Sequence, residues 1–173
     1  MPGTDVPPDD ERYMREALRL AASAGDAGEI PVGALVVSRG AIIGRGANRQ
    51  IRDGDPTAHA EIVALREAAR VAGDFRLRES TVYTTLEPCA MCAGALVTAR
   101  VARLVFGSRD LRFGAVRSKF RIADSDLLNH RMEISEGVLA AECLAPLRSF
   151  FEARRLQDRG RRRRRASPPR SRD

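Results

Sequence analysis

One histidine and two cysteines in this chain have the types and spacing of metal ligands. His59 stands two residues before Glu61, and two residues separate Cys89 from Cys92. Cysteines three positions apart on a helix share one face, and a place in the first turn favours the thiolate. An imidazole and two thiolates suit zinc, and three protein ligands leave a fourth position open, as in catalytic sites. We therefore predict a zinc ion bound by His59, Cys89 and Cys92.

Glu61 supplies the acid–base group that an open zinc site needs. Two thiolates cancel the charge of Zn²⁺ and a neutral His59 adds none, so water at the open position would ionise near neutral pH. Glu61 could take the proton from that water and return it to a leaving group. A closed structural site would need a fourth ligand, and the remaining candidates are Cys143 and His130. We expect both to be buried or exposed without binding metal, so the open arrangement is favoured.

The predicted elements bring these residues to one edge of a sheet. Apolar periodicity predicts helices over about residues 9–24, 58–72, 89–100 and 139–155. Strands are predicted over 32–37, 41–47, 80–86, 101–106 and 132–136, the first two forming a hairpin. Thr57 is expected to cap the second helix, and Pro88 to open the third. The strand between these two helices brings their N-termini to the sheet edge where α/β proteins bind ligands.

The order of these elements indicates an α/β fold, a three-layer α/β/α sandwich around a central mixed five-stranded sheet. The length of 173 residues suits one domain, which we place at residues 9–157. Residues 1–8 are expected to form a flexible arm. The Arg-rich run 158–173 cannot bury a core, so we expect it to be a disordered tail.

Composition excludes several classes of protein. The chain has no apolar run near the roughly 18 residues of a membrane span, and its start lacks a signal-peptide core. Three cysteines without an export signal favour a reducing cytoplasm over a disulfide framework. We therefore expect a cytoplasmic protein without a membrane partner.

Positive charge is concentrated at the C-terminus. Residues 158–173 hold eight arginines against two aspartates, a net +6, which leaves +1 of the overall +7 for residues 1–157. A run of this kind is typical either of a solvated appendage or of a segment with affinity for RNA.

The sequence around the candidate ligands resembles the zinc-dependent cytidine deaminase superfamily. Its signature is matched by His59-Ala60-Glu61 and by Pro88-Cys89-Ala90-Met91-Cys92. Flanking segments are similar, more narrowly, to the bacterial tRNA-specific adenosine deaminases: residues 30–34, 55–62, 85–95, 106–110, 129–131 and 150–151. The resemblance covers about residues 10–156. The metal motif is shared by the whole superfamily, so the flanking segments carry the narrower likeness.

The resemblance implies a homodimer that deaminates the wobble adenosine of a tRNA anticodon to inosine. Each subunit would hold one zinc ion, with His59, Cys89 and Cys92 as ligands and Glu61 as the proton shuttle. Asn48 would contact the purine, and the Ala60 backbone would line the same pocket. Residues expected near the anticodon stem-loop are Asp110, Phe151, Arg154 and Arg155. An adenine already splayed out of a loop would spare the enzyme the cost of unstacking it.

One loop departs from the family pattern, and two other functions stay open. Arg117 stands where the family usually carries glycine, which leaves altered RNA contact or altered loop geometry open. One alternative is a deaminase of a free base or nucleoside, such as guanine or cytidine. The other is a non-catalytic, zinc-stabilised RNA-binding module. Arg154, Arg155 and the basic tail favour a polyanionic substrate, and Glu61 argues against a purely structural zinc.

Overall fold

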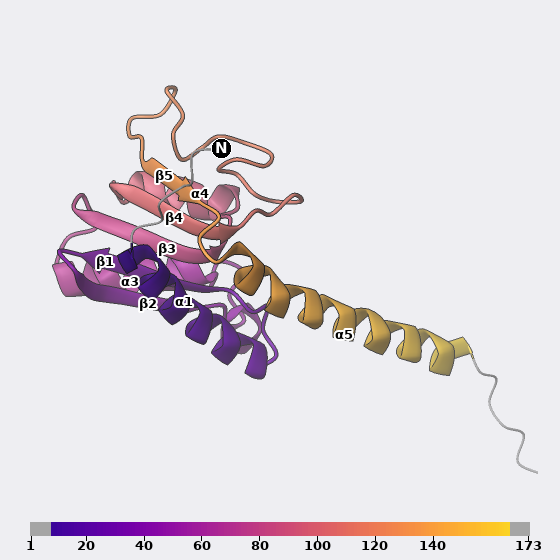
Figure 1. Cartoon of the computed structure of the whole chain (residues 1–173). Coiled ribbons are helices and arrows are strands. Elements are labelled where there is room, and N and C mark those ends of the chain that lie inside the picture. The colour runs from indigo at the N-terminus through magenta and orange to yellow at the C-terminus, as the bar shows by residue number, and fades with distance from the viewer. Residues whose placement is uncertain (1–7, 167–173) are drawn as a thin grey trace, which may run out of the picture.

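Five strands form one mixed sheet in the order β2-β1-β3-β4-β5 (Figure 1). In the computed structural model, which describes residues 8–166, these are β1 (Gly33–Ser38), β2 (Ala41–Ala47), β3 (Ser80–Leu86), β4 (Arg103–Ser108) and β5 (Glu133–Glu136). β1 runs antiparallel to both β2 and β3, whereas β3, β4 and β5 are parallel to one another. The predicted mixed five-stranded sheet is confirmed.

Helices cover both faces of this sheet. They are α1 (Pro8–Asp26), α2 (Gln50–Asp53), α3 (Ala60–Ala72), α4 (Ala90–Thr98) and α5 (Ala140–Ala166). α1 and the first turns of α5 pack on one face, and α3 and α4 on the other (Figure 1). The three-layer α/β/α sandwich predicted from the order of elements is therefore confirmed. Between residues 8 and 166, no helix has the length and hydrophobicity needed to cross a membrane.

Alternation along β1 divides the core between the two faces. Ala34 and Val36 belong to the apolar cluster shared with α3 and α4, whereas Leu35 and Val37 belong to the cluster shared with α1. Successive strand side chains point to opposite faces, so a strand covered on both sides is apolar throughout. All four side chains are buried, which makes β1 a central strand of the sandwich.

Glycines in β2 bring its backbone against α3. A Cβ atom at Gly46 would lie 1.9 Å from the Ala60 carbonyl oxygen, and one at Gly44 would lie 2.3 Å from that of Ala64. Only glycine permits so close an approach. The first turn of α3 is thereby held beside the end of β2, where Asn48 follows.

Local structure differs from expectation in three places. Thr57 does not cap α3: His59 is the N-cap residue, and the Thr57 hydroxyl instead donates to Asp55 Oδ1 at 2.7 Å. The short helix α2 was not expected, because it buries no residue and so has no apolar pattern. The prediction of a disordered tail from residue 158 is wrong over residues 158–166.

Those nine residues continue α5, which projects beyond the sandwich (Figure 1). Arginine is a good helix former, and lengthening an existing helix avoids the cost of nucleation, so burial is not required. α1 begins at Pro8. The rest of the expected arm (residues 1–7) and of the expected tail (residues 167–173) lies outside the described residues.

Candidate active site

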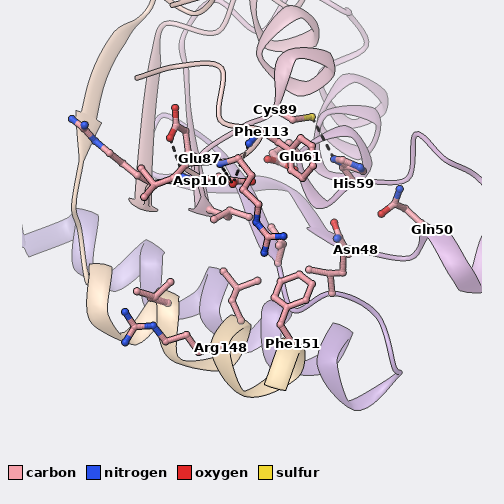
Figure 2. A pocket seen from close by; sticks show the side chains of 18 of the residues that line it. Asn48, Gln50, His59, Glu61, Glu87, Cys89, Asp110, Phe113, Arg148 and Phe151 are labelled. Carbon is pink, nitrogen blue, oxygen red and sulfur yellow. Dashed lines mark hydrogen bonds between the residues drawn. The ribbon is translucent and has the colours of Figure 1, made fainter. Parts of the chain in front are cut away.

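His59, Cys89 and Cys92 converge where α3 and α4 begin. Figure 2 shows the contact between Cys89 and His59. His59 Nδ1 lies 3.7 Å from Cys89 Sγ and 3.5 Å from Cys92 Sγ, and the three ligand atoms lie within 4.8 Å of one another. Ligands about 2.0–2.3 Å from one zinc ion have separations of this size. The donor set and the geometry therefore fit zinc, as predicted.

Cys89 is the thiol prepared to bind a cation, whereas the hydrogen bond to Cys89 and burial raise the pKa of Cys92. A hydrogen bond from the Cys92 thiol lowers the pKa of Cys89 to about 4, against the effect of burial, and the His59 ring lowers it further. The hydrogen bond between the His59 ring and Cys89 also raises the pKa of His59. Because the thiolate is the form that binds metal, Cys89 offers a ligand at neutral pH.

Glu61 lies beside this cluster and contributes no ligand atom to it. It is only 4% exposed, in the first turn of α3, and it lines the same pocket as His59 and Cys89. Burial raises the pKa of its carboxyl. A carboxyl with a raised pKa can accept a proton at one step of a reaction and release it at the next.

The cluster opens into a pocket of about 670 Å³. Its wall is built from the end of β2 with α2, the first turn of α3, the segment that follows β4, and α5 (Figure 2). Apolar side chains such as Ile30, Leu86 and Leu147 line part of this wall. Four arginines also line it: Arg109, Arg112, Arg148 and Arg155. The pocket thus combines an apolar interior with exposed cationic groups.

Asn48 lines the pocket from the end of β2, as expected of a residue that contacts substrate. Its Oδ1 atom accepts a hydrogen bond from the backbone N–H of Ala60 at 2.8 Å. The Ala60 backbone therefore faces Asn48, and Ala60 is not among the residues that line the pocket.

The predicted RNA contacts divide into two groups. Asp110, Phe151 and Arg155 line the pocket. Arg154 is not among the lining residues, and its guanidinium lies over the Phe150 ring, 5.4 Å from the centroid. The fold brings three of the four residues to the candidate site.

Three residues discussed in the sequence have ordinary structural roles: Cys143, His130 and Arg117. Cys143 is fully buried in the core, and His130 Nε2 lies 2.6 Å from the Val101 carbonyl oxygen, so neither belongs to the metal cluster. Arg117, the departure from the family pattern, pairs with Asp124 at 3.0 Å and does not line the pocket. Its side chain thus bonds within its own loop.

Two buried carboxylates beside the pocket were not predicted. Glu87, 2% exposed, lines the pocket and accepts hydrogen bonds from the segment that follows β4. Burial alone would raise the pKa of Glu87, but hydrogen bonds from the Ser118 hydroxyl and three backbone amides outweigh it and lower the pKa. Glu29 accepts from two amides of α2, at 2.8 and 3.2 Å. The one signal in the sequence for Glu87 is an acidic residue directly after a buried strand.

Comparison with known proteins agrees with this geometry. The tRNA-specific adenosine deaminase of Haemophilus influenzae is 52% identical over 147 residues, which are 84% of this chain and 85% of that protein. A solved structure of a tRNA:A34 deaminase, from work on A-to-I editing at the wobble position of transfer RNA, matches with a TM-score of 0.76 and 40% identity. It covers 79% of this chain and 99% of its own.

A guanine deaminase from Nitrosomonas europaea shares the fold at a lower identity. Its TM-score is 0.71 at 27% identity, covering 81% of this chain and 83% of its own. The family model for the cytidine and deoxycytidylate deaminase zinc-binding region matches residues 7–108, more than half of the chain. That region contains His59, Glu61, Cys89 and Cys92. The chain therefore belongs to the zinc-dependent cytidine and deoxycytidylate deaminase family.

Proposed function

We propose that this protein hydrolytically deaminates the wobble adenosine of a tRNA anticodon to inosine. The observation that carries the proposal is the position of Glu61, a buried carboxyl beside a three-ligand metal cluster at one pocket. A purely structural zinc site has no use for such a group. The high identity to proteins named tRNA-specific adenosine deaminase supports the choice of substrate.

The residues of the chain divide the chemistry between them. His59, Cys89 and Cys92 would hold zinc, whose Lewis acidity lets water ionise near neutral pH. Glu61 would take the proton of that water and deliver it to the departing nitrogen, so that oxygen is added at adenine C6 and ammonia leaves. Asn48 would hold the purine in the pocket.

The charges around the pocket favour RNA over a free base. Arg148 and Arg155 are exposed on α5, and Arg112 lies over the Phe151 ring at 5.6 Å. Guanidinium groups bind phosphates, and aromatic or guanidinium planes stack on splayed bases. A free purine would offer none of the phosphates that these arginines suit.

We further propose that the enzyme acts as a homodimer in the cytoplasm, where tRNA is found. The loop between β4 and β5 carries large apolar side chains outside the pocket that are exposed in the single chain: Phe120, Leu127 and Leu128. We take this loop as the candidate interface, because large exposed apolar patches mark contacts between proteins. Light scattering on the purified protein would give the subunit number.

One experiment separates the candidate activities. The protein is incubated with total tRNA, with free guanine and with cytidine, and A-to-I changes, guanine consumption and uridine are measured. Inosine confined to anticodon wobble positions is the expected result. Guanine or cytidine turnover without inosine would support the free-base or nucleoside alternative. No turnover, together with unfolding on zinc removal, would support a structural RNA-binding module.

A further inference from the structure

The segment Asp110–Ser118 contributes to the pocket wall and folds around the carboxylate of Glu87. Glu87 Oε1 accepts hydrogen bonds from the backbone amides of Val116, Arg117 and Ser118, at 3.1, 2.6 and 2.8 Å. Glu87 Oε2 accepts from the Asp110 amide at 3.0 Å and from the Ser118 hydroxyl. One side chain therefore ties both ends of the segment to the end of β3.

This contact is enclosed and contains no cation. A Cβ atom at Gly114 would lie 2.3 Å from the Glu87 carboxyl carbon, so the segment wraps closely around the carboxylate. The Ala115 amide adds a hydrogen bond to the Pro88 carbonyl at 2.8 Å. Glu87 belongs to none of the ion pairs among the described residues. Its negative charge is satisfied by N–H and O–H donors of the segment itself.

Asp110 connects Glu87 to the turn that forms part of the pocket wall. The Asp110 carboxylate accepts from the amides of Arg112 and Phe113 at 2.9 and 3.2 Å, which closes a turn. Arg112 then reaches across to the Phe151 ring on α5. Leu111 and Phe113 are 73% and 67% exposed, so burial does little to hold this turn.

We propose that Glu87 is a positioning residue, which holds the Asp110–Phe113 turn in the conformation that receives the RNA substrate. The inference rests on the proposed function, because it takes an anticodon stem-loop as the substrate. Binding would otherwise have to order this exposed turn, and that entropy would be lost from the affinity. Holding the turn in advance removes this cost.

Glu87→Gln tests the proposal at one end of the segment. The glutamine oxygen should face the three amides at the Oε1 position, which places the new NH₂ group against the Asp110 N–H. Two donors then face each other, and only the Asp110 end is released. For an anticodon stem-loop RNA we expect KM to rise about tenfold, while kcat stays within about threefold and zinc stays at one per subunit.

Hydrogen exchange provides a readout that does not depend on activity. In Glu87→Gln, the amides of Asp110, Arg112 and Phe113 should exchange at least about tenfold faster, while those of residues 116–118 keep their protection. Ser118→Ala removes one hydroxyl donor and leaves the Asp110 contact, so its KM should rise only about two- to threefold. If Glu87→Gln does not fold, Ser118→Ala is measured in its place, because its hydroxyl shares the Oε2 atom of Glu87 with the Asp110 amide. A KM raised two- to threefold with faster exchange at residues 110–113 supports the positioning role, and unchanged values refute it.

Asp10 provides a matched control on another face of the sheet. It is also a buried carboxyl, bonded to Arg103 at 2.7 Å, and it does not line the pocket. Asp10→Asn should lower stability and leave KM unchanged. An unchanged KM in Glu87→Gln, or a loss of zinc from it, would overturn the positioning role.

If the wild-type protein does not deaminate the stem-loop, the proposed function fails. Hydrogen exchange then still decides whether Glu87 orders the turn. Faster exchange confined to residues 110–113 supports the positioning role, and unchanged exchange refutes it.

Discussion

The side-chain oxygen of Asn48 accepts a hydrogen bond from the Ala60 backbone amide, 2.8 Å away, across the contact between β2 and α3. An N–H donor must face the oxygen of an amide side chain, so this contact sets the orientation of Asn48. The NH₂ group is then the part that remains for substrate. It can donate to a ring nitrogen of a purine. One side chain thus joins the start of α3 to the substrate pocket.

Asn48→Asp should separate these two roles. The aspartate can still accept from the Ala60 amide, but it has no N–H to donate, and its charge opposes an acceptor on the base. We expect the transition-state stabilisation obtained from kcat/KM for tRNA to fall by about 1–3 kcal/mol. Zinc content and stability should stay close to wild type. Asn48→Ala should show the same kinetic loss together with a lower melting temperature. Wild-type kinetics in both variants would exclude Asn48 as a substrate contact.

Glu61→Gln should keep the fold and the zinc and lose the chemical step. The amide keeps the shape of the carboxyl but cannot take a proton from water. We expect single-turnover rates to fall about 10²–10⁴-fold. Metal analysis of the purified variant is the control. If the variant loses zinc, Glu61 is a ligand and not a proton carrier.

His59→Ala, Cys89→Ala and Cys92→Ala should each lose zinc and activity together, because each removes one of three ligands. Cys143→Ala is the matched control: this thiol is buried in the core, away from the cluster. It should retain one zinc per subunit, measured by atomic emission. A cysteine-ligand variant that keeps stoichiometric zinc would contradict the predicted ligand set.

The elements predicted with the least error are those whose pattern is local. Ser80–Leu86 is a strand with the predicted bounds because β-branched and aromatic residues follow one another there. The end of α5 was placed wrongly because disorder was inferred from the lack of apolar residues, and a helix that is already formed can extend into solvent.

Long-range contacts could not be predicted from these patterns. Asp110 was expected at the RNA, and it does line the pocket, but its bond to Glu87 joins positions 23 apart in the chain. No short motif records which amides fold around a given carboxylate. The metal ligands were found because their chemistry restricts the residue types, whereas a buried glutamate resembles any other glutamate in a sequence.

The buried pair Asp10–Arg103 should make stability depend on acid pH. Burial alone would raise the pKa of Asp10, but hydrogen bonds from Arg103 and Tyr83 outweigh it and lower the pKa below its usual value. The stabilisation is therefore complete above about pH 4, the unfolded value, and is lost as the pH falls through the lower folded pKa. Asp10→Asn should reduce the free energy of unfolding at pH 7, measured by urea denaturation, by about 3 kcal/mol. At a pH below the folded pKa, the two proteins should converge; a constant difference would contradict this.

The arginines after Gln157 should contribute long-range attraction to RNA without entering the chemistry. Residues 158–173 carry a net +6, and six of their eight arginines precede Ala166, where α5 ends. Each phosphate neutralised on single-stranded RNA adds about 0.7 to the salt slope of log affinity, so four engaged arginines correspond to about 3 units. Ending the chain after Gln157 should remove that amount from the slope, whereas ending it after Ala166 should retain most of it. Maximal turnover at saturating tRNA should stay near wild type in both, because Glu61 and the metal ligands lie elsewhere. Parallel plots of log affinity against log salt concentration for the full chain and the chain ending at Gln157 would mean that these arginines are a solvated extension of α5. The affinity for RNA would then come from the arginines of the pocket.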